Sequence, residues 1–348
     1  MSDLKIQIKN LYKIFGPNGA KQVEKVKNGV GKAELLADHG HVLGLENVSV
    51  DIPARKIQVI MGLSGSGKST LIRHINRLID PTAGEILVDG KDVLSMSADE
   101  LQHFRRFGAS MVFQKFGLLP HRTVIENCMY GVKIQGVPDA EAVPRAQKWL
   151  ERVGLKGFED RYPAQLSGGM QQRVGLARAL ATDAEILLMD EAFSALDPLI
   201  RMDMQDVLLD LQEELHKTIV FITHDLDEAL RIGDNICILR DGAVVQAGAP
   251  QEIVLKPADE YVRDFIQEIN RSRVLEVGTV AKKGTSKSKC VLPHDTTIED
   301  ALQIISNADV TTATVTRDGD KVGVATLADM IAAIAKPEGE KKGIESYR

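Results

Sequence analysis

The chain has 348 residues, 44% of them hydrophobic and 26% charged, which is the balance of an ordinary globular protein with room for two domains. The net charge of −6 at pH 7 is spread along the sequence, so the composition argues against a polyelectrolyte that binds nucleic acid. No apolar run reaches the roughly 20 residues that span a bilayer, and the opening stretch MSDLKIQIKN lacks the apolar core of a secretion signal. Cys128, Cys237 and Cys290 lack metal-site or redox spacing, and we expect reduced thiols.

The N-terminal part of the sequence predicts three strands and one insertion. Residues 4–15 begin with the alternation of a half-buried strand, and the apolar runs at 42–52 and 56–62 supply two more. The segment 17–41, PNGAKQVEKVKNGVGKAELLADHGH, is too long and too helix-prone for a hairpin turn. We therefore expect an inserted short helix between two strands. Its apolar face would consist of Val23, Val26, Val30 and Leu35.

From residue 56 onward, short apolar strands alternate with helical patterns. The later apolar runs are nearly continuous, which is typical of parallel strands buried on both faces. A hairpin is expected over 235–248, with its turn at Arg240, Asp241 and Gly242, and the pattern closes near residue 270. The expected strands are 109–114, 185–191 and 218–224, and the expected helices are 141–154 and 199–216.

A second, smaller domain is expected after a polar linker at 281–289. Residues 275–336 carry a compact βαββα pattern. The last residues, 337–348, are charged, and we expect a mobile tail. The expected elements of the smaller domain are strands at 289–293, 311–316 and 322–326 and helices at 297–308 and 327–335.

A phosphate-binding loop follows the strand at 56–62. The stretch GLSGSGKS fits the pattern G-x-x-x-x-G-K-[ST] between an apolar strand and a helix. Its glycines let backbone N–H groups point at phosphate oxygens, and the helix N-terminus adds about half a positive charge. Lys68 would lie between the β- and γ-phosphates of a nucleotide, and the Ser69 hydroxyl would bind Mg²⁺. The expected nucleotide-binding residues of this loop are Gly62, Ser64, Gly65, Ser66, Gly67, Lys68, Ser69 and Thr70.

Polar side chains follow the later strands and suit the chemistry of phosphate transfer to water. Asp190 suits the shell of Mg²⁺, held through water, and Glu191 is placed to polarise the attacking water as a general base or to orient it. Gln114 ends one expected strand, where its amide is able to reach Mg²⁺ or that water. His224 ends another, where its imidazole is able to bind the γ-phosphate. Taken alone, Gln114 and His224 are weak signals, because most such residues are structural.

A second glycine-rich helix start is the most specific feature of the sequence. The stretch LSGGMQQRVGLARALA at 166–181, together with MDEAFSALD at 189–197 and the lone His224, resembles the ATP-binding subunits of ABC transporters over residues 4–270. The resemblance implies an ABC-type P-loop ATPase fold of class α/β, with a parallel core sheet, an antiparallel β subdomain and a helical subdomain. It also implies a head-to-tail homodimer that holds ATP and Mg²⁺ between its protomers. The residues facing the partner's ATP would be Ser167, Gly168, Gly169 and Gln171.

The same resemblance assigns roles to single residues. Phe15, in YKIFG, matches the aromatic that stacks on adenine, with Tyr12 as the alternative. Glu191 matches the catalytic carboxylate, and Gln114 and His224 match residues that sense the nucleotide. The loop that links the two sites across the dimer would be Ser194, Ala195, Leu196 and Asp197.

Four longer stretches narrow the resemblance to the glycine betaine/proline betaine transport ATPases: the insertion at 17–41, IMGLSGSGKSTLIRHINRLIDPTAG at 60–84, MVFQKFGLLPHRTVIEN at 111–127 and LLMDEAFSALDPLIRMDMQ at 187–205. This branch implies an ATPase coupled to the uptake of quaternary amines, on the cytoplasmic face of the bacterial inner membrane. The implied partners are an integral-membrane permease, which would contact the segment after Gln114, and an extracytoplasmic substrate-binding protein. An importer of histidine in the same branch stays open.

Other classes of protein fit less well. ABC ATPases of translation usually carry two cassettes in one chain, and those of DNA repair split the cassette with a long coiled coil, whereas this sequence shows one cassette and no heptad run of that length. A kinase or GTPase that uses only the phosphate-binding loop would not need the LSGGM stretch, so this class is disfavoured. Many exporters fuse the ATPase to membrane spans, and no such span occurs in this sequence.

The pattern at 275–336 resembles a single CBS module, and GVATLAD at 323–329 fits the ligand-binding stretch of such modules. In that case Thr326 and Asp329 would hold the phosphate and ribose of an adenine nucleotide. CBS modules work in pairs, and two protomers would supply the pair. The alternative is a dimerising module that binds no ligand.

Overall fold

The computed structural model describes residues 3–114, 116–194, 196–267, 269–284, 286 and 288–335. The chain divides into two units: the larger contains the residues up to Asp225 and Ile232–Ala247, and the smaller contains Leu226–Arg231 and the residues from Gly248 onward. Ala195 and the expected tail 337–348 lie outside the described residues. Among those that are described, every helix is too short or too polar to span a bilayer.

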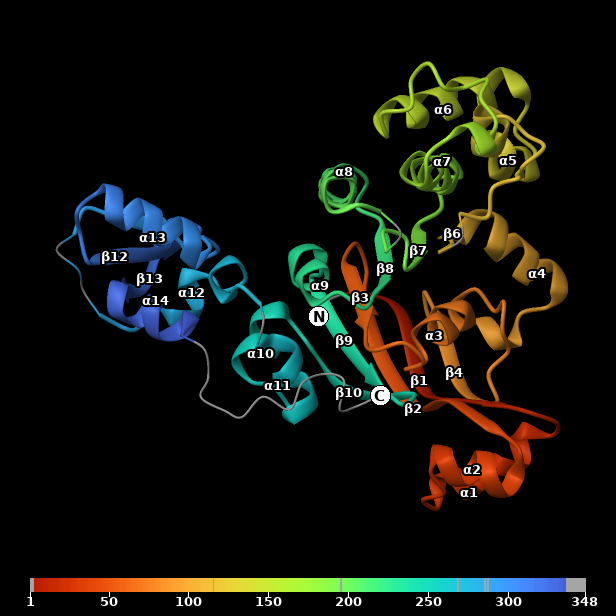
Figure 1. Cartoon of the computed structure of the whole chain (residues 1–348), viewed down its shortest axis with the longest axis horizontal. Coiled ribbons are helices and arrows are strands. Elements are labelled where there is room, and N and C mark those ends of the chain that lie inside the picture. The colour runs from red at the N-terminus through yellow and green to blue at the C-terminus, as the bar shows by residue number, and fades with distance from the viewer. Residues whose placement is uncertain are drawn as a thin grey trace. The chain divides into compact units, whose positions relative to one another are not determined.

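The core of the larger unit is a six-stranded sheet in the order β10-β9-β3-β8-β7-β6 (Figure 1). Neighbouring strands from β9 to β6 run parallel, and every residue of β3, β7 and β8 is buried. The expected parallel sheet is therefore confirmed, and its carboxyl ends meet at one edge. The strands are β3 (Ile57–Met61), β6 (Ala109–Val112), β7 (Ile186–Asp190), β8 (Thr218–Thr223), β9 (Asn235–Arg240) and β10 (Ala243–Gly248).

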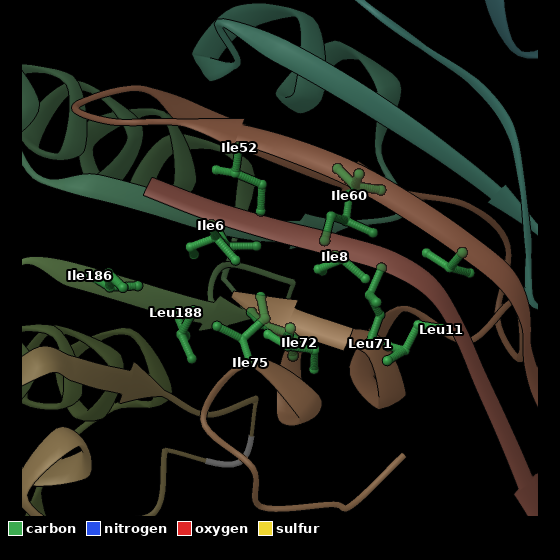
Figure 2. Close-up of a cluster of buried hydrophobic side chains, with 14 of the residues drawn as sticks. Ile6, Ile8, Leu11, Ile52, Ile60, Leu71, Ile72, Ile75, Ile186 and Leu188 are labelled. Carbon is green, nitrogen blue, oxygen red and sulfur yellow. The ribbon is translucent and has the colours of Figure 1, made fainter. Parts of the chain in front are cut away.

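A second sheet of the larger unit is antiparallel, in the order β2-β1-β4-β5. Figure 2 shows its apolar side chains meeting those of helix α3 (Lys68–Ile75) and of the core sheet in one cluster, which includes Ile6, Leu71 and Leu188. Burial of each such side chain contributes about 1.5–3 kcal/mol, so this cluster fixes α3 between the two sheets. The strands are β1 (Leu4–Phe15), β2 (Val42–Pro53), β4 (Ala83–Val88) and β5 (Lys91–Asp92).

The insertion between β1 and β2 forms two short α-helices rather than one. Helix α1 (Val23–Lys27) ends before Gly29, whose φ of 101° breaks the helix, and α2 (Lys32–His39) ends at Gly40, which adopts the left-handed conformation of a helix C-terminus. The expected apolar face is confirmed, since its residues pack on the side chains of the two flanking strands. The packed residues are Val23, Val26 and Leu35 with Tyr12, Ile14 and Leu43, and Val30 lies beside them.

A helical group stands beside the β6 edge of the core sheet (Figure 1). Capping boxes start two of these helices, at Ser97 before α4 and at Thr123 before α5. Helix α4 continues as a π-helical turn at Phe104–Gly108, which leads into β6. The helices of the larger unit after α3 are α4 (Ala98–His103), α5 (Val124–Ile134), α6 (Asp139–Arg152), α7 (Gly168–Ala181) and α8 (Pro198–Leu215).

The smaller unit contains a three-stranded sheet in the order β11-β12-β13, with one parallel and one antiparallel pair. The expected linker at 281–289 is partly wrong, because Lys282 exchanges two backbone hydrogen bonds of 2.9 Å with Val324 and so extends this sheet. The elements are α9 (Leu226–Ile232), α10 (Pro250–Leu255), α11 (Glu260–Ile266), α12 (Val277–Val280), β11 (Val291–Pro293), α13 (Ile298–Asn307), β12 (Thr312–Arg317), β13 (Asp320–Thr326) and α14 (Leu327–Ile334).

The buried His74 of α3 predicts a loss of stability in acid. Burial lowers its pKa from 6.5 to about 4, so the unfolded chain binds a proton first as the pH falls below 6.5. The free energy of unfolding should then decrease by about 2 kcal/mol between pH 7 and pH 5. Urea denaturation of His74→Gln should show a flatter pH dependence than the wild type. The surface variant His121→Gln is the control and should behave like the wild type. If the free energy of unfolding depended on pH equally in the wild type, His74→Gln and His121→Gln, the prediction would be contradicted.

Candidate nucleotide site

The loop between β3 and α3 needs glycine at two positions, because a side chain there would collide with a neighbouring strand. A Cβ on Gly62 would lie 2.2 Å from the carbonyl oxygen of Leu239, and a Cβ on Gly67 would lie 2.7 Å from that of Gly44. Both glycines have φ values in the left-handed region, at 152° and 101°. A Cβ on Gly65, at φ 79°, would meet no atom within 4 Å. The loop is therefore fixed from behind by β9 and β2, and it is open at Gly65.

The Lys68 side chain folds back over this loop. Its Nζ donates to the carbonyl oxygens of Gly62, at 2.9 Å, and Leu63, at 3.1 Å, and lies 3.5 Å from Glu191 Oε1. Burial lowers the pKa of the Lys68 ammonium, while Glu191 and Asp190 oppose that effect. The Ser66 hydroxyl is buried and has no hydrogen-bond partner among the described residues. The loop thus brings one ammonium group and the N–H groups of a helix start to one place, a donor set that fits phosphate.

Ser69 and Asp190 are in direct contact. Ser69 Oγ donates to Asp190 Oδ1 at 2.7 Å, and Arg73 donates to Asp190 Oδ2 at 2.9 Å. Asp190 ends β7 and is fully buried, so these partners stabilise its charge. Arg73 was missed by the sequence reasoning, although it lies one helical turn after Ser69 and so shares its face of α3. A hydroxyl and a carboxylate oxygen are ligands that Mg²⁺ prefers.

Glu191 is the centre of a second cluster. Gln114 Nε2 donates to Glu191 Oε2 at 2.8 Å, and His224 Nδ1 lies 3.9 Å from the same oxygen. Glu191 has a φ of 47°, which turns the chain sharply after β7. The structure therefore brings together Gln114, Glu191, His224 and the Lys68 ammonium, although Gln114 lies two residues beyond the end of β6 rather than in it.

The stretch from Ser167 to Gln171 starts helix α7. Ser167 Oγ accepts from the N–H of Met170 at 3.3 Å as the N-cap, and the Gln171 amide donates to Leu166 O at 3.3 Å. Gly168 and Gly169 form the first turn. Within the part of the chain that the structure describes, no hydrogen bond or ion pair joins this stretch to the phosphate-binding loop. Among the described residues, the second glycine-rich helix start therefore makes no direct polar contact with the loop of its own chain.

The loop after β7 is tied down at both ends. Ser194 Oγ donates to the backbone oxygen of Glu191 at 2.9 Å, and Asp197 caps helix α8 by accepting from the N–H of Ile200 at 3.1 Å. Arg201 donates to the backbone oxygen of Leu196 at 3.2 Å. These bonds hold Ser194, Leu196 and Asp197 in place directly after the Glu191 cluster.

Of the two candidate aromatic residues, Phe15 is the accessible one. Its side chain is 40% exposed, whereas Tyr12 is 7% exposed and packs under the insertion. The Phe15 ring lies against Gly44, where a Cβ would come within 2.7 Å of ring atom Cε2. Gly44 also contacts Gly67 of the phosphate-binding loop, so one glycine separates the ring from the loop. This arrangement favours Phe15 for stacking on a base.

The two residues expected to hold a ligand in the smaller unit are bonded to each other. Thr326 caps α14 by accepting from the N–H of Asp329 at 3.0 Å, and its hydroxyl donates to Asp329 Oδ2 at 2.7 Å. Lys282 also pairs with Asp329 and, together with Thr326, lowers the pKa of this carboxyl. These contacts explain how α14 begins, and the ligand role stays a prediction.

Comparison with known proteins places this geometry in a family. The sequence model of the ABC transporter family matches residues 45–194. The glycine betaine transport ATP-binding protein OpuAA of Bacillus subtilis is 55% identical over 80% of this chain and 67% of its own length. The chain belongs to the ATP-binding subunits of ABC transporters. The glycine betaine/proline betaine transport system ATP-binding protein ProV of Salmonella typhimurium is 45% identical over 97% of this chain and 84% of its own length.

A solved structure confirms the cassette fold. The dimeric structure of the bacterial ABC transporter cassette MJ0796 matches with a TM-score of 0.61 and 34% identity, over 70% of this chain and 98% of that one. This ABC subunit is thus an ATPase. None of the described residues form a cluster of three or more acidic, histidine or cysteine side chains able to hold a metal by themselves. An ion at Ser69 and Asp190 would therefore be shared with phosphate oxygens.

The two contrasting glycines give a test of this loop. Gly65→Ala should fold, with a modest loss of thermal stability, and should bind ATP about tenfold more weakly, because the methyl group occupies the open side of the loop. Gly62→Ala should unfold or fail to accumulate, since its methyl group collides with the backbone of β9. Thermal unfolding and titration with a fluorescent ATP analogue would separate the two effects. Equal stability of both variants would contradict this assignment.

Proposed function

We propose that this chain is the ATP-hydrolysing subunit of an importer for glycine betaine and related quaternary amines. The observation that carries the proposal is the match to the ProV protein, which extends over 97% of this chain and so includes the insertion and most of the smaller unit. The match to OpuAA, which has glycine betaine in its name, points to the same substrate class. An importer of histidine or another amino-acid derivative is the second candidate. A soluble ABC ATPase acting on ribosomes or DNA is disfavoured by these relatives.

In the proposed site, the loop residues from Gly62 to Thr70 enclose the phosphates of ATP. The Lys68 ammonium would move from the carbonyl oxygens of its own loop to the β- and γ-phosphates, which carry more charge. The first turn of α3 would add its N–H groups. The exposed ring of Phe15 would stack on the adenine.

Mg²⁺ fits the oxygen atoms at the end of β7. Ser69 Oγ and the Gln114 side-chain oxygen would bind the ion directly, and Asp190 would hold it through water. The contact of 2.7 Å between Ser69 and Asp190 supports a shared position for the ion. When bound, Mg²⁺ neutralises charge on the phosphates. Arg73 would keep Asp190 oriented toward the site.

Glu191 would hold the proton of the attacking water. Its carboxylate accepts from Gln114 and lies near His224, so a water between these groups would meet one acceptor and two polar neighbours. Displacement of Lys68 onto ATP would leave the Glu191 carboxylate available as a base. His224 would contact the γ-phosphate.

We further propose that two copies pack head to tail. The stretch from Ser167 to Gln171 starts a helix and, among the described residues, makes no polar contact with its own phosphate-binding loop, and such a start suits an anion supplied by a partner. The turn Ser194–Asp197, which includes Ala195, would lie at the dimer interface and link the two sites. The similar cassette described as dimeric supports this arrangement.

The dimer would lie under a separate permease on the cytoplasmic face of the membrane, and a substrate-binding protein outside would deliver the solute. ATP binding would close the dimer, and the segment after Gln114 would transmit that motion to the permease. In this proposal, residues 4–270 form the ATPase domain, and residues 275–336 form a CBS-like module for pairing or for binding an adenine nucleotide at Thr326 and Asp329.

The role of Glu191 is tested by Glu191→Gln. This variant should bind MgATP with near-normal affinity and hydrolyse it at least about 100-fold more slowly, because the amide accepts no proton from water. The control is Glu213→Gln, an exposed position on α8. Turnover and nucleotide affinity should be measured on both. A Glu191→Gln enzyme with turnover close to wild type would remove Glu191 from the base role and leave the ATP site intact.

The transport assignment is tested in native membranes. The tagged chain should co-purify with a multi-span permease, and vesicles loaded with ATP should take up labelled glycine betaine against a gradient. Competition by choline or proline betaine, but not by histidine, would agree with the proposal. Uptake competed only by histidine would support the second candidate. Recovery with ribosomes or DNA in the soluble fraction would contradict transport.

A further inference from the structure

A cavity of about 670 Å³ lies at the amino ends of the core strands, away from the nucleotide site. Its walls come from the start of β1, the turn after β4, helix α4 with its π-helical continuation, and Glu185, which precedes β7. The volume lies within the range of small-molecule sites. The nucleotide cluster at Glu191 follows the opposite end of the same strand. The cavity is therefore distinct from the ATP site.

Aromatic rings line one side of this cavity. His103 and Phe107 lie with their ring centroids 4.8 Å apart, and Phe104 supports the wall from the core. The π-helical turn at Phe104–Gly108 sets this side of the cavity, and such turns recur at functional sites. Phe107 is 42% exposed, so part of its ring stays accessible beside His103.

The cavity lining also carries a surplus of negative charge. Four carboxylates and two lysines line the cavity. Burial alone would lower the pKa of Lys5, but its bonds to Asp89 and Glu185 outweigh burial and raise it, while Lys5 lowers the pKa of Glu185. With more carboxylates than lysines in it, the lining repels phosphate and favours a cation. The carboxylates are Asp89, Asp92, Glu100 and Glu185, and the lysines are Lys5 and Lys91.

The carboxylates already have partners inside the protein, which disfavours a metal ion as the natural occupant. Asp89 and Glu185 share Lys5, Asp92 accepts from a backbone N–H, and Glu100 accepts from the N–H of Ser97. No metal-binding cluster of the required side chains occurs among the described residues. The negative charge of the lining therefore attracts a cation by its electrostatic potential, and the carboxylates do not have to coordinate it directly.

We propose that this cavity binds a small organic cation with a methylated ammonium head group. A fully methylated, quaternary ammonium group donates no hydrogen bond, so its recognition rests on aromatic faces and nearby negative charge, and this lining supplies both. Phe107 and His103 would face the head group, and Glu185 would supply charge at the mouth. The binding site depends on this lining alone and not on the transport function proposed above.

Choline and its neutral isostere 3,3-dimethyl-1-butanol test the proposal by ligand-observed NMR titration of the full chain. Choline should bind about tenfold more tightly than the isostere, because only choline carries the charge. Saturating MgATP should leave choline binding unchanged. Equal dissociation constants for the two ligands, or no choline binding, would overturn the proposal. Competition by MgATP would move the binding to the nucleotide site and overturn it as well.

Variants of Phe107 and Lys91 are expected to change the affinity for choline in opposite directions. Phe107→Leu keeps apolar bulk without a π face and should weaken choline binding about threefold to tenfold, whereas Phe107→Trp should retain or strengthen it. Lys91→Glu removes a positive charge from the lining and should tighten choline binding about threefold, a gain that misfolding does not produce. Phe158→Leu, at an exposed ring outside the cavity, is the control. Unchanged affinity in Phe107→Leu and Lys91→Glu would refute the site.

Discussion

The buried carboxylate of Asp190 is the constraint on which the rest of the site depends. A charge without access to water is costly unless it is paired, and here Ser69 and Arg73 supply the partners from successive turns of α3. This pairing fixes α3 to the end of β7. It therefore sets the position of Lys68 at the start of α3 relative to Glu191 after β7, at 3.5 Å.

The order of the core strands explains why residues far apart in sequence meet. Strands β3, β8, β7 and β6 are neighbours and run parallel, so the segments after them leave from one edge of the sheet. Those segments carry the phosphate-binding loop, His224, Glu191 and Gln114. Because each strand is a short buried apolar run, the sequence predicted both the sheet and this convergence. Parallel strands are recognisable because each is a continuous apolar run and successive strands are joined by a helix, so no tight-turn signal is needed to predict them.

Periodicity failed where the backbone departs from regular geometry. Strand β1 contains register shifts after Ile8, Leu11 and Lys13, so faces do not alternate strictly, and adjacent Leu11 and Tyr12 are both buried. No alternation rule was able to choose between Tyr12 and Phe15 for that reason. The pairing of Lys282 with Val324 was also unpredictable, because a backbone bridge leaves no mark on side-chain chemistry. The spacing of Arg73, four residues after Ser69 on α3, would have predicted its contact with Asp190, but only once Asp190 was known to lie opposite that helix.

The segment after β7 connects the Glu191 cluster to the start of helix α8. Its first bond, from Ser194, goes to the backbone oxygen of Glu191, and its other end is held by Arg201, which donates to Leu196 and to Asp225 beside His224. Arg201, in the first turn of α8, thus connects the segment after β7 to the residue that follows His224. A shift of this segment would reach the backbone of Glu191 through Ser194 and would reach Asp225 through Arg201.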